Sequence, residues 1–338
     1  PSSVFSFVFR PTSIMILPDP IVLGTRGSIL ARWQADHVRS KLEAHGHRVA
    51  VDIIQTTGDR VQDTPISEIG DEAVFTKELD RALLSGDIHA AVHSLKDVPT
   101  RVPDGITLAA IGDREQPHDA FIAHPSFDGS LEDLPEGATI ATASLRRKAQ
   151  LKAWRPDLQI VPVRGNVDSR LEKLDASDWH GMILAVAGLL RMGLATRIRE
   201  SIPVDIMVPA VGQGALGIAC MVDEEGVREV LRSTLHHEAT GWMTTTERAF
   251  LRKVGGGCQV PMGAWARMDE QDTLVVDACI AALDGSELFR DRRRCAPDAA
   301  ADTGRALAND LLERGGAEVL RGIIDDRSEV PSQFPFHP

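Results

Sequence analysis

Along residues 21 to about 219, short apolar runs alternate with segments whose apolar residues recur every three to four positions. The runs predict buried strands and the periodic segments predict helices, which together indicate α/β layers. Strands are expected at residues 21–23, 49–54, 88–92, 107–111, 121–123, 139–141, 159–163, 182–186 and 216–219.

The first expected helix follows the first strand. Ser28 precedes it with the side chain of a good N-cap, and its apolar face is expected to consist of Leu30, Trp33, Val38 and Leu42. Hydroxyl side chains at this position accept a hydrogen bond from the first turn, so Ser28 is predicted to fix the start of the helix.

The pattern changes beyond about Glu238. Thr244 and Glu247 have the spacing of a capping box, which predicts a helix from there to Val254. Three β-like runs and a final helix around residues 303–314 follow. This part is expected to form a separate, smaller α+β unit.

Composition places the chain among ordinary globular proteins. Hydrophobic residues make up 43% and charged residues 25% of the chain. Its length of 338 residues is more than a single hydrophobic core accommodates. No apolar stretch reaches the roughly 18 residues of a membrane span. Residues 1–19 contain several prolines and make a poor signal peptide, so we expect a disordered lead. Four scattered cysteines without C-x-x-C spacing favour a reduced, cytoplasmic setting.

Charge restricts the class of partner. The net charge of −12 disfavours binding to nucleic acid or to an anionic membrane, so an anion site must be local. All but seven of the 37 basic residues are arginine, whose planar guanidinium binds carboxylate or phosphate with two parallel hydrogen bonds.

Several arginines occur where a predicted strand gives way to a helix. The carboxyl ends of strands form the ligand crevice of open α/β sheets, and a cation in the first turn of a helix is unfavourable unless an anion is present. The pattern therefore predicts a cleft for a ligand rich in carboxylates or phosphates. Ordinary surface ion pairs are the alternative. The residues concerned are Arg26, Arg146, Arg147, Arg164, Arg170 and Arg191.

Lys96 and Asp97 follow a buried strand and precede Pro99, which places both at the rim of a sheet. Beside an arginine-rich cleft, Asp97 would stay ionised and could bind N–H groups or stabilise a developing cation. The alternative is a turn aspartate that caps its own backbone. His93, just before them, is expected to be a packed strand residue rather than a catalyst.

Cys258 follows three glycines, which leave its thiol accessible and suited to covalent attachment. The alternative is a small buried side chain. Cys220 and Cys279 lie in apolar runs and are expected to be buried. No metal site is expected at Cys258, because no other cysteine or histidine has ligand spacing to it.

Six segments in order closely resemble the porphobilinogen deaminase family, over residues 21 to about 324. The resemblance implies two α/β domains of the periplasmic-binding-protein kind around a cleft, plus a C-terminal α+β domain. It assigns residues 20–114 and 215–235 to the first domain, 115–214 to the second and 236–330 to the third. The six segments are GTRGS (24–28), HSLKDVP (93–99), SLRR (144–147), RGN (164–166), PAVGQGA (209–215) and GGCQVP (256–261).

The resemblance also implies an activity. Family members are transferases of tetrapyrrole and heme biosynthesis that condense four porphobilinogen molecules with loss of ammonia and release hydroxymethylbilane by hydrolysis. They carry a dipyrromethane cofactor, here expected on Cys258 through a thioether. We expect a monomer without nucleic-acid or membrane partners.

The same matching implies the site residues. Asp97 corresponds to the catalytic aspartate, with Lys96 beside it, and Phe75 and Lys77 would lie near the cleft mouth. Cofactor and substrate would be bound by Lys96, Asp97, Arg26, Ser28, Thr142, Ser144, Arg146, Arg147, Arg164, Arg170, Arg191 and Gln213.

The chain departs from the family at Glu68 and Glu72, where many members have lysines in the active-site loop. This departure puts the role of the loop in doubt. Two other readings stay open: a hinged two-lobe binding protein for a carboxylate-rich small molecule, without chemistry, and a transferase that uses Cys258 as a nucleophile. The first would leave Cys258 unmodified, and thiol-modification kinetics would identify the second.

Overall fold

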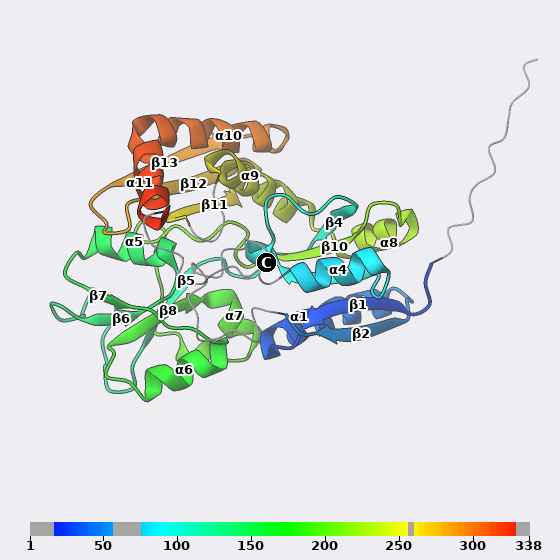
Figure 1. Ribbon diagram of the computed structural model, residues 1–338, viewed down its shortest axis with the longest axis horizontal. Coiled ribbons are helices and arrows are strands. Elements are labelled where there is room, and N and C mark those ends of the chain that lie inside the picture. The colour runs from blue at the N-terminus through cyan, green and yellow to red at the C-terminus, as the bar shows by residue number, and fades with distance from the viewer. Residues whose placement is uncertain (1–16, 57–75, 256–259, 329–338) are drawn as a thin grey trace, which may run out of the picture.

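The computed structural model describes residues 17–56, 76–255 and 260–328, with backbone alone for 324–328, and most of the expected disordered lead lies outside this part. Its strands form two five-stranded sheets and one three-stranded sheet. In Figure 1 the sheets and their helices form three lobes: the first blue to cyan with a yellow-green strand and helix, the second green, and the C-terminal lobe yellow to red. The expected α/β class with a smaller C-terminal unit is confirmed.

The first sheet has the strand order β2-β1-β3-β10-β4. Strand β1 pairs parallel with β2 and β3, whereas β10 runs antiparallel between β3 and β4. Helices α1 and α8 pack on one face and α4 on the other, because alternate residues of each strand point to opposite faces. The bounds are β1 (Ile21–Arg26), β2 (Val49–Ile54), β3 (Ala90–Ser94), β4 (Ile106–Ile111), β10 (Leu216–Met221), α1 (Ile29–Ala44), α4 (Lys77–Ser85) and α8 (Glu225–Leu235).

The second sheet repeats this arrangement with the order β7-β6-β8-β5-β9. β6 pairs parallel with β7 and β8, and β5 runs antiparallel between β8 and β9. Helix α5 packs on one face, and α6 and α7 pack on the other. The bounds are β5 (Asp119–Ala123), β6 (Thr139–Ala141), β7 (Gln159–Val161), β8 (Gly181–Ala185), β9 (Glu200–Ser201), α5 (Leu145–Trp154), α6 (Val167–Asp175), α7 (Val186–Arg191) and a 3₁₀ turn (Ala195–Arg197).

Two connections carry the chain between the sheets, from β4 to β5 and from β9 to β10. They run side by side: the N–H of Gly112 donates to the carbonyl of Leu216, and the N–H of Glu115 donates to the carbonyl of Gly214, both at 3.0 Å. In each sheet the strand entered by such a connection is the reversed fourth strand. The two lobes therefore meet at this pair of connections.

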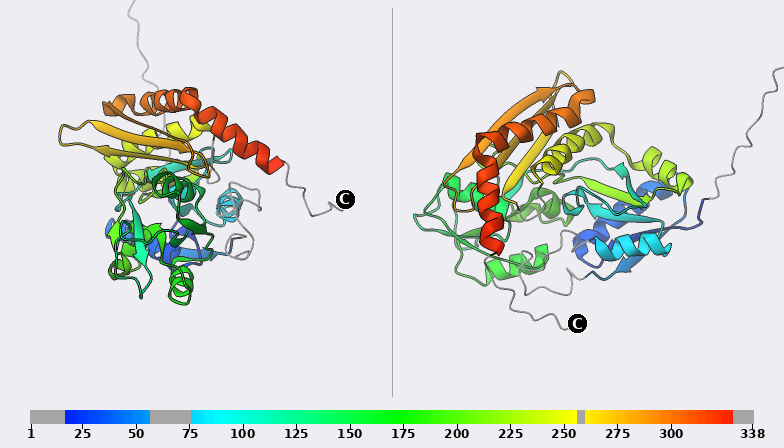
Figure 2. Two further views of the ribbon diagram at one scale, coloured as in Figure 1. Left: turned by 90° about the vertical axis from the view of Figure 1, so that its left-hand side faces the viewer. Right: turned by 45° about the horizontal axis from the view of Figure 1, so that its top comes forward.

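The C-terminal lobe has three antiparallel strands, and α9 and α10 lie side by side on one face of them (Figure 2). A π-helical turn, Leu312–Gly316, joins α10 to a further helix that the sequence pattern did not predict. The bounds are β11 (Met262–Met268), β12 (Leu274–Ala281), β13 (Leu288–Cys295), α9 (Glu238–Val254), a 3₁₀ turn (Pro297–Ala299), α10 (Ala300–Leu311) and α11 (Ala317–Ser328).

Glu247, on α9, joins this lobe to both connections. Its buried carboxylate pairs with Arg114 of the first connection, with 2.6 Å between Oε1 and Nη1. It also accepts hydrogen bonds from the N–H groups of Gly212, in the second connection, and Ala266, in β11, both at 2.7 Å. One carboxylate thus holds three chain segments together.

The predicted capping box is wrong. Helix α9 begins at Glu238, and the side chain of His237 caps it by accepting from the N–H of Thr240. The hydroxyl of Thr244 instead donates to the carbonyl of Thr240, one turn back within the helix, at 2.8 Å. Glu247 is unavailable for capping because Arg114 occupies it.

The predicted apolar face of the first helix is correct only in part. Val38 and Leu42 are buried in the core, but the buried stripe continues through Ala31 and Ala35. Trp33 is 37% exposed, because this side of α1 faces the second lobe rather than its own sheet. The domain boundaries expected from the sequence stay a prediction.

Candidate active site

A pocket of about 90 Å³ lies between the first and second lobes, next to the second connection. It receives side chains from α1, from the turn after β3, from α5 and α6 and from the β8–α7 junction. The residues that line it are Leu30, Gln34, Ser94, Lys96, Arg147, Val167, Arg170, Leu184, Ala185, Ala187, Gly188, Arg191, Gln213, Gly214 and Ala215.

Beneath this pocket, Asp119 binds two arginines. Its carboxylate oxygens lie 2.6 Å from Nη1 of Arg146 and 2.7 Å from Nη2 of Arg147, and all three side chains are almost fully buried. Burial alone would raise the pKa of Asp119, but the two guanidinium groups outweigh it and hold the pKa far below its usual range. Arg146 also donates to the carbonyl of Val208 at 2.8 Å and Arg147 to that of Ile183 at 2.9 Å, and of the two Arg147 lines the pocket.

Gln213 connects this ion cluster to Lys96. Its amide nitrogen donates to Asp119 at 3.1 Å and to the carbonyl of Pro117 at 2.7 Å. Its amide oxygen accepts from Nζ of Lys96 at 3.3 Å. Burial lowers the pKa of Lys96 to about 8, with neighbouring Asp97 opposing the shift and Arg147 adding to it. Lys96 therefore loses its proton at a lower pH than an exposed lysine does.

Arg164 and Arg170 add positive charge beside Arg147. Burial, with Arg147 and Arg164 nearby, lowers the pKa of Arg170 to about 10, and Asp97 partly opposes this shift. Nη1 of Arg164 is buried and has no hydrogen-bond partner among the described residues. Crowded cations with too little opposing charge favour an anionic ligand, and an unpartnered buried guanidinium nitrogen gives that ligand a donor.

Arg191 ends α7 and reaches across to the first lobe. Its Nη2 donates to the carbonyl of Gly214 at 2.7 Å, and its guanidinium carbon lies 5.6 Å from the ring centre of Trp33. Arg26 is the last residue of β1, in the sheet of the first lobe. Burial and this arginine together lower the pKa of His93 to about 4, so His93 is a neutral, buried strand residue, as predicted.

Three predicted binding hydroxyls cap turns of the backbone. Ser28 accepts from the N–H of Ala31, which confirms it as an N-cap, and Ser144 caps α5 in the same way by accepting from the N–H of Arg147. Thr142 accepts from the N–H of Ser144 at 3.2 Å. A hydroxyl that accepts in this way keeps its own hydrogen, so each can still donate to a carboxylate.

Some predicted residues lie outside the described part of the chain or away from the pocket. The residues outside the described part of the chain are Cys258, Phe75 and the loop residues Glu68 and Glu72. Lys77 is described and is the first, exposed residue of α4.

Two site residues were missed in the sequence. Asp119 opens a buried strand, and an acidic residue at the start of an apolar run signals a buried charge that needs a cation. Gln34 interrupts the small-residue stripe of α1 and donates to Oγ of Ser94 at 2.8 Å. A polar residue within a helix's buried face was the corresponding signal.

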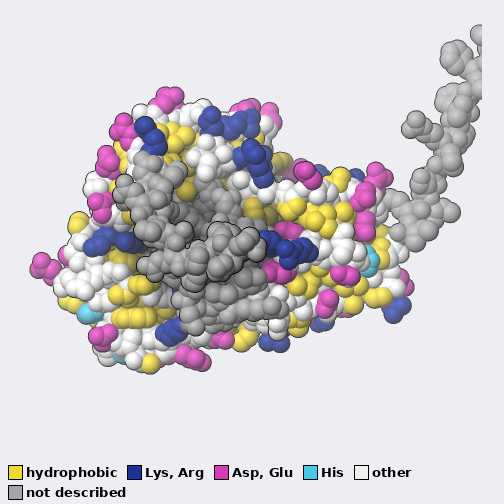
Figure 3. Space-filling model, in the orientation of Figure 1, with side chains coloured by type: hydrophobic (Ala, Val, Ile, Leu, Met, Phe, Trp, Pro, Cys, Tyr) yellow, Lys and Arg dark blue, Asp and Glu magenta, His cyan; other side chains and the backbone are white. Residues whose placement is uncertain are grey.

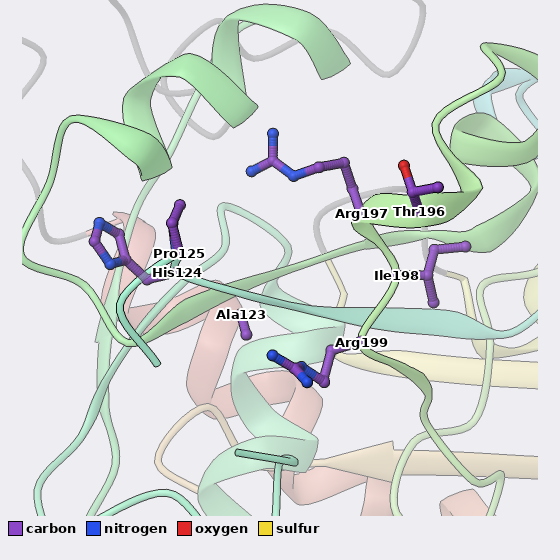
Figure 4. A pocket seen from close by; sticks show the side chains of 7 residues that line it. All are labelled: Ala123, His124, Pro125, Thr196, Arg197, Ile198 and Arg199. Carbon is purple, nitrogen blue, oxygen red and sulfur yellow. The ribbon is translucent and has the colours of Figure 1, made fainter. Parts of the chain in front are cut away.

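A larger, open pocket of about 420 Å³ lies at the edge of the second sheet (Figure 4). Arg197 and Arg199 extend from one segment beside it, but Asp175 and Asp128 pair with them. Its arginines are thus already neutralised. On the face drawn in Figure 3, acidic and basic side chains are likewise interspersed. Among the described residues, Arg170 and Arg191 at the smaller pocket between the lobes have no carboxylate within ion-pair distance.

Comparison with known proteins identifies relatives over most of the chain. The model of the porphobilinogen deaminase, dipyromethane cofactor binding domain matches residues 21–229, and that of the porphobilinogen deaminase C-terminal domain matches residues 243–313. A porphobilinogen deaminase of Syntrophomonas wolfei is 46% identical over 300 residues, 88% of this chain and 97% of its own. That of Desulforudis audaxviator is 47% identical over 305 residues, 90% and 97% of the two chains. Among solved structures, the methionine-binding protein MetQ aligns with a TM-score of 0.42 and 14% identity, over 64% of this chain and 90% of its own.

Proposed function

The chain belongs to the porphobilinogen deaminase family, and from this premise we propose how its residues perform the reaction. It is a transferase that joins four porphobilinogen molecules head to tail on a dipyrromethane primer and releases hydroxymethylbilane by hydrolysis. In each condensation the substrate's aminomethyl ammonium leaves as ammonia, a carbon–carbon bond forms to the next pyrrole, and that pyrrole loses a proton.

The observation that carries the proposal is that the described residues lining the pocket between the lobes include several cations and no carboxylate. Each pyrrole unit carries an acetate and a propionate, so the ligand is a polycarboxylate that needs several cations. Arg147, Arg170 and Arg191 line one pocket, and the carboxylate of Asp119 neutralises only part of this charge. We assign these three arginines, with Lys96, to the carboxylates of primer and substrate.

Asp97 is the proposed catalytic residue. It lies beside Lys96 in the 3₁₀ turn Leu95–Asp97, at the carboxyl end of β3. Its negative charge acts to raise the pKa of both Lys96 and Arg170. A carboxylate in a partly desolvated site stabilises the positive charge that develops as ammonia leaves. Its neighbour Lys96 would hold a substrate carboxylate and orient the reacting carbon.

The residues present fit the dipyrromethane cofactor. Nη1 of Arg164 supplies a buried donor that needs an acceptor, and the hydroxyls of Ser144 and Thr142 lie next to Arg146 and Arg147 in the chain. When bound, the cofactor supplies the pyrrole end to which the first substrate is joined. Attachment to Cys258 is part of this proposal and rests on the glycine run before it.

Intact mass measurement tests the assignment. The purified protein should be heavier than its sequence by one dipyrromethane, and Cys258→Ser should remove the increment and the activity together. The buried cysteines offer a matched control: Cys220→Ser should keep the added mass. An active preparation whose mass equals that of the bare sequence would overturn the attachment, and an inactive preparation of that mass would favour a binding protein.

Other properties extend the proposal. No helix in the described part of the chain is long and apolar enough to cross a membrane. We propose a monomer in the cytoplasm that acts on porphobilinogen without a nucleic-acid partner, which sedimentation and fractionation of cell extracts would test.

A further inference from the structure

We propose that Arg248 and Arg252 of α9 are positioning residues for Asp97. They belong to the C-terminal lobe and hold the segment directly after the catalytic turn of the first lobe. The proposal rests on the proposed role of Asp97, and the experiment below separates the two.

The two arginines bind three successive carbonyl groups. Arg248 donates from Nη1 to the carbonyl of Val98 at 3.0 Å and from Nη2 to that of Pro99 at 2.7 Å. Arg252 donates from Nη2 to the carbonyl of Thr100 at 2.9 Å. Because the two arginines are four residues apart, they share one face of α9, which packs against β4 of the first lobe (Figure 1).

Arg248 forms these bonds in a largely desolvated place. Burial, with Arg252 nearby, lowers its pKa to about 10. Among the described residues no carboxylate lies within ion-pair distance of Arg248, so backbone carbonyls are its recorded partners. Desolvating a guanidinium that meets only neutral acceptors costs stability, because no full negative charge compensates it. Because the contact does not stabilise the packing of the lobes, a functional requirement explains it better.

The turn that carries Asp97 needs support from outside. It is one 3₁₀ turn, closed by a bond from the N–H of Val98 to the carbonyl of Leu95 at 3.1 Å. Short 3₁₀ turns have poor hydrogen-bond geometry, whereas a catalytic carboxylate must be held to within about 0.5 Å. Without further contacts, Asp97 would be free to shift by more than that.

Asp97 lies between two anchors. On its N-terminal side, Leu95 is buried, its N–H donates to the carbonyl of Ala215 at 3.0 Å, and a Cβ on Gly212 would lie 2.9 Å from its side chain. On its C-terminal side, Arg248 and Arg252 hold the next three carbonyls. The second connection and α9 thus fix the turn from opposite ends.

Helix α9 also leads towards the proposed cofactor cysteine. It ends at Val254, four residues before Cys258 in the chain. One helix therefore determines where the Asp97 segment lies and where the chain towards Cys258 begins.

The test compares Arg248→Met with a matched arginine elsewhere. Arg290 of β13 also donates to two successive carbonyls of another lobe, those of Val204 and Asp205, but lies in a different interface. We expect Arg248→Met to lower kcat by about 10- to 100-fold with KM changed less than about threefold, since a shift of about 1 Å costs up to 10²-fold. Arg290→Met should leave kcat unchanged, and thermal melting should show that both variants are folded.

A double-mutant cycle isolates the action through Asp97. In an Asp97→Glu background the carboxylate is already misplaced, so Arg248→Met should lower kcat by less than about threefold. Arg252→Met should show the same pattern with a smaller loss, and Arg248→Lys, which keeps one donor, should fall between wild type and Arg248→Met. If Arg248→Met does not fold, the kcat values of Arg252→Met and Arg248→Lys test the positioning role instead.

Equal fold losses of kcat in both backgrounds, or an Arg290→Met variant as slow as Arg248→Met, would overturn the positioning role. Unchanged kcat in Asp97→Glu and Asp97→Ala would instead overturn the proposed role of Asp97 itself. Intact mass should show full cofactor loading in all arginine variants; loss of loading that accounts for the lost activity would also count against positioning.

Discussion

The side chain of Lys96 donates a hydrogen bond to that of Gln213, with 3.3 Å between Nζ and Oε1. Lys96 follows a strand of the first lobe, and Gln213 belongs to the second connection and donates in turn to Asp119 at the start of the second sheet. Through Gln213, the residue next to the proposed catalytic aspartate is therefore linked to the buried arginine cluster of the other lobe.

The low pKa of Lys96 predicts an alkaline limit of activity. Because burial lowers that pKa to about 8, the ammonium is lost as the pH rises through 8, and kcat/KM for porphobilinogen should fall there. Lys96→Arg keeps its charge and should move the limit upwards, whereas Lys152→Arg, on the surface, should not. A limit unchanged in Lys96→Arg would assign it to another group.

Lys96 affects stability in the opposite direction: activity should fall as the pH rises, whereas the free energy of unfolding should increase. The unfolded chain binds more protons than the folded protein between pH 8 and the ordinary value of 10.5, so Lys96 makes the free energy of unfolding rise with pH in this window. Urea unfolding at several pH values should show this slope in wild type and lose it in Lys96→Met.

Asp97→Ala should lose activity without unfolding. The carboxylate is half-buried at the rim of the sheet, and removal of such a charge-stabilising group costs about 2.7–4 kcal/mol in the barrier, roughly 10²- to 10³-fold in rate. Thermal melting should stay within a few degrees of wild type. Asp104→Ala, in the exposed loop nearby, is the control and should be fully active. A largely active Asp97→Ala enzyme would reduce Asp97 to a turn residue.

Glu247→Gln should destabilise the protein strongly. It removes the charge that compensates buried Arg114, and breaking a buried pair costs about 3–5 kcal/mol in the free energy of unfolding. Glu225→Gln removes the surface partner of Arg228 and should cost less than about 1 kcal/mol. Urea unfolding of both variants measures the difference. Equal losses in the free energy of unfolding would show that the contacts of Glu247 with three chain segments do not stabilise the protein.

The arginines should divide into structural and ligand-binding members. Arg146→Met leaves the buried carboxylate of Asp119 with one cation fewer, so we expect lower stability and blocked cofactor assembly. Arg147→Met should block assembly or an early condensation. Arg191→Met removes a pocket cation at the edge of the second lobe and should affect later chain growth. Mass spectra of stalled complexes would identify the accumulating intermediates; identical profiles would refute the division.

Local sequence signals were reliable where the physics is local. Ser28 and Ser144 cap helices because a hydroxyl needs only the N–H groups two or three residues ahead of it. The same kind of signal failed at Thr244 and Glu247, since a buried arginine from another segment occupies the glutamate. Capping and periodicity extend over about one helical turn and carry no information about distant partners.

The sequence by itself determined the order and type of most elements, the arginine-rich strand ends and, through its six segments, the family. Only the tertiary structure decided which cations remain for a ligand: Asp119 binds Arg146 from 27 positions away, and Gln213 meets Lys96 across 117. It also placed Arg248 on the carbonyls of Val98 and Pro99. The physical reason is that a buried charge is stabilised by whichever group the sheet order and the two connections bring within hydrogen-bond distance, and this depends on the whole chain path.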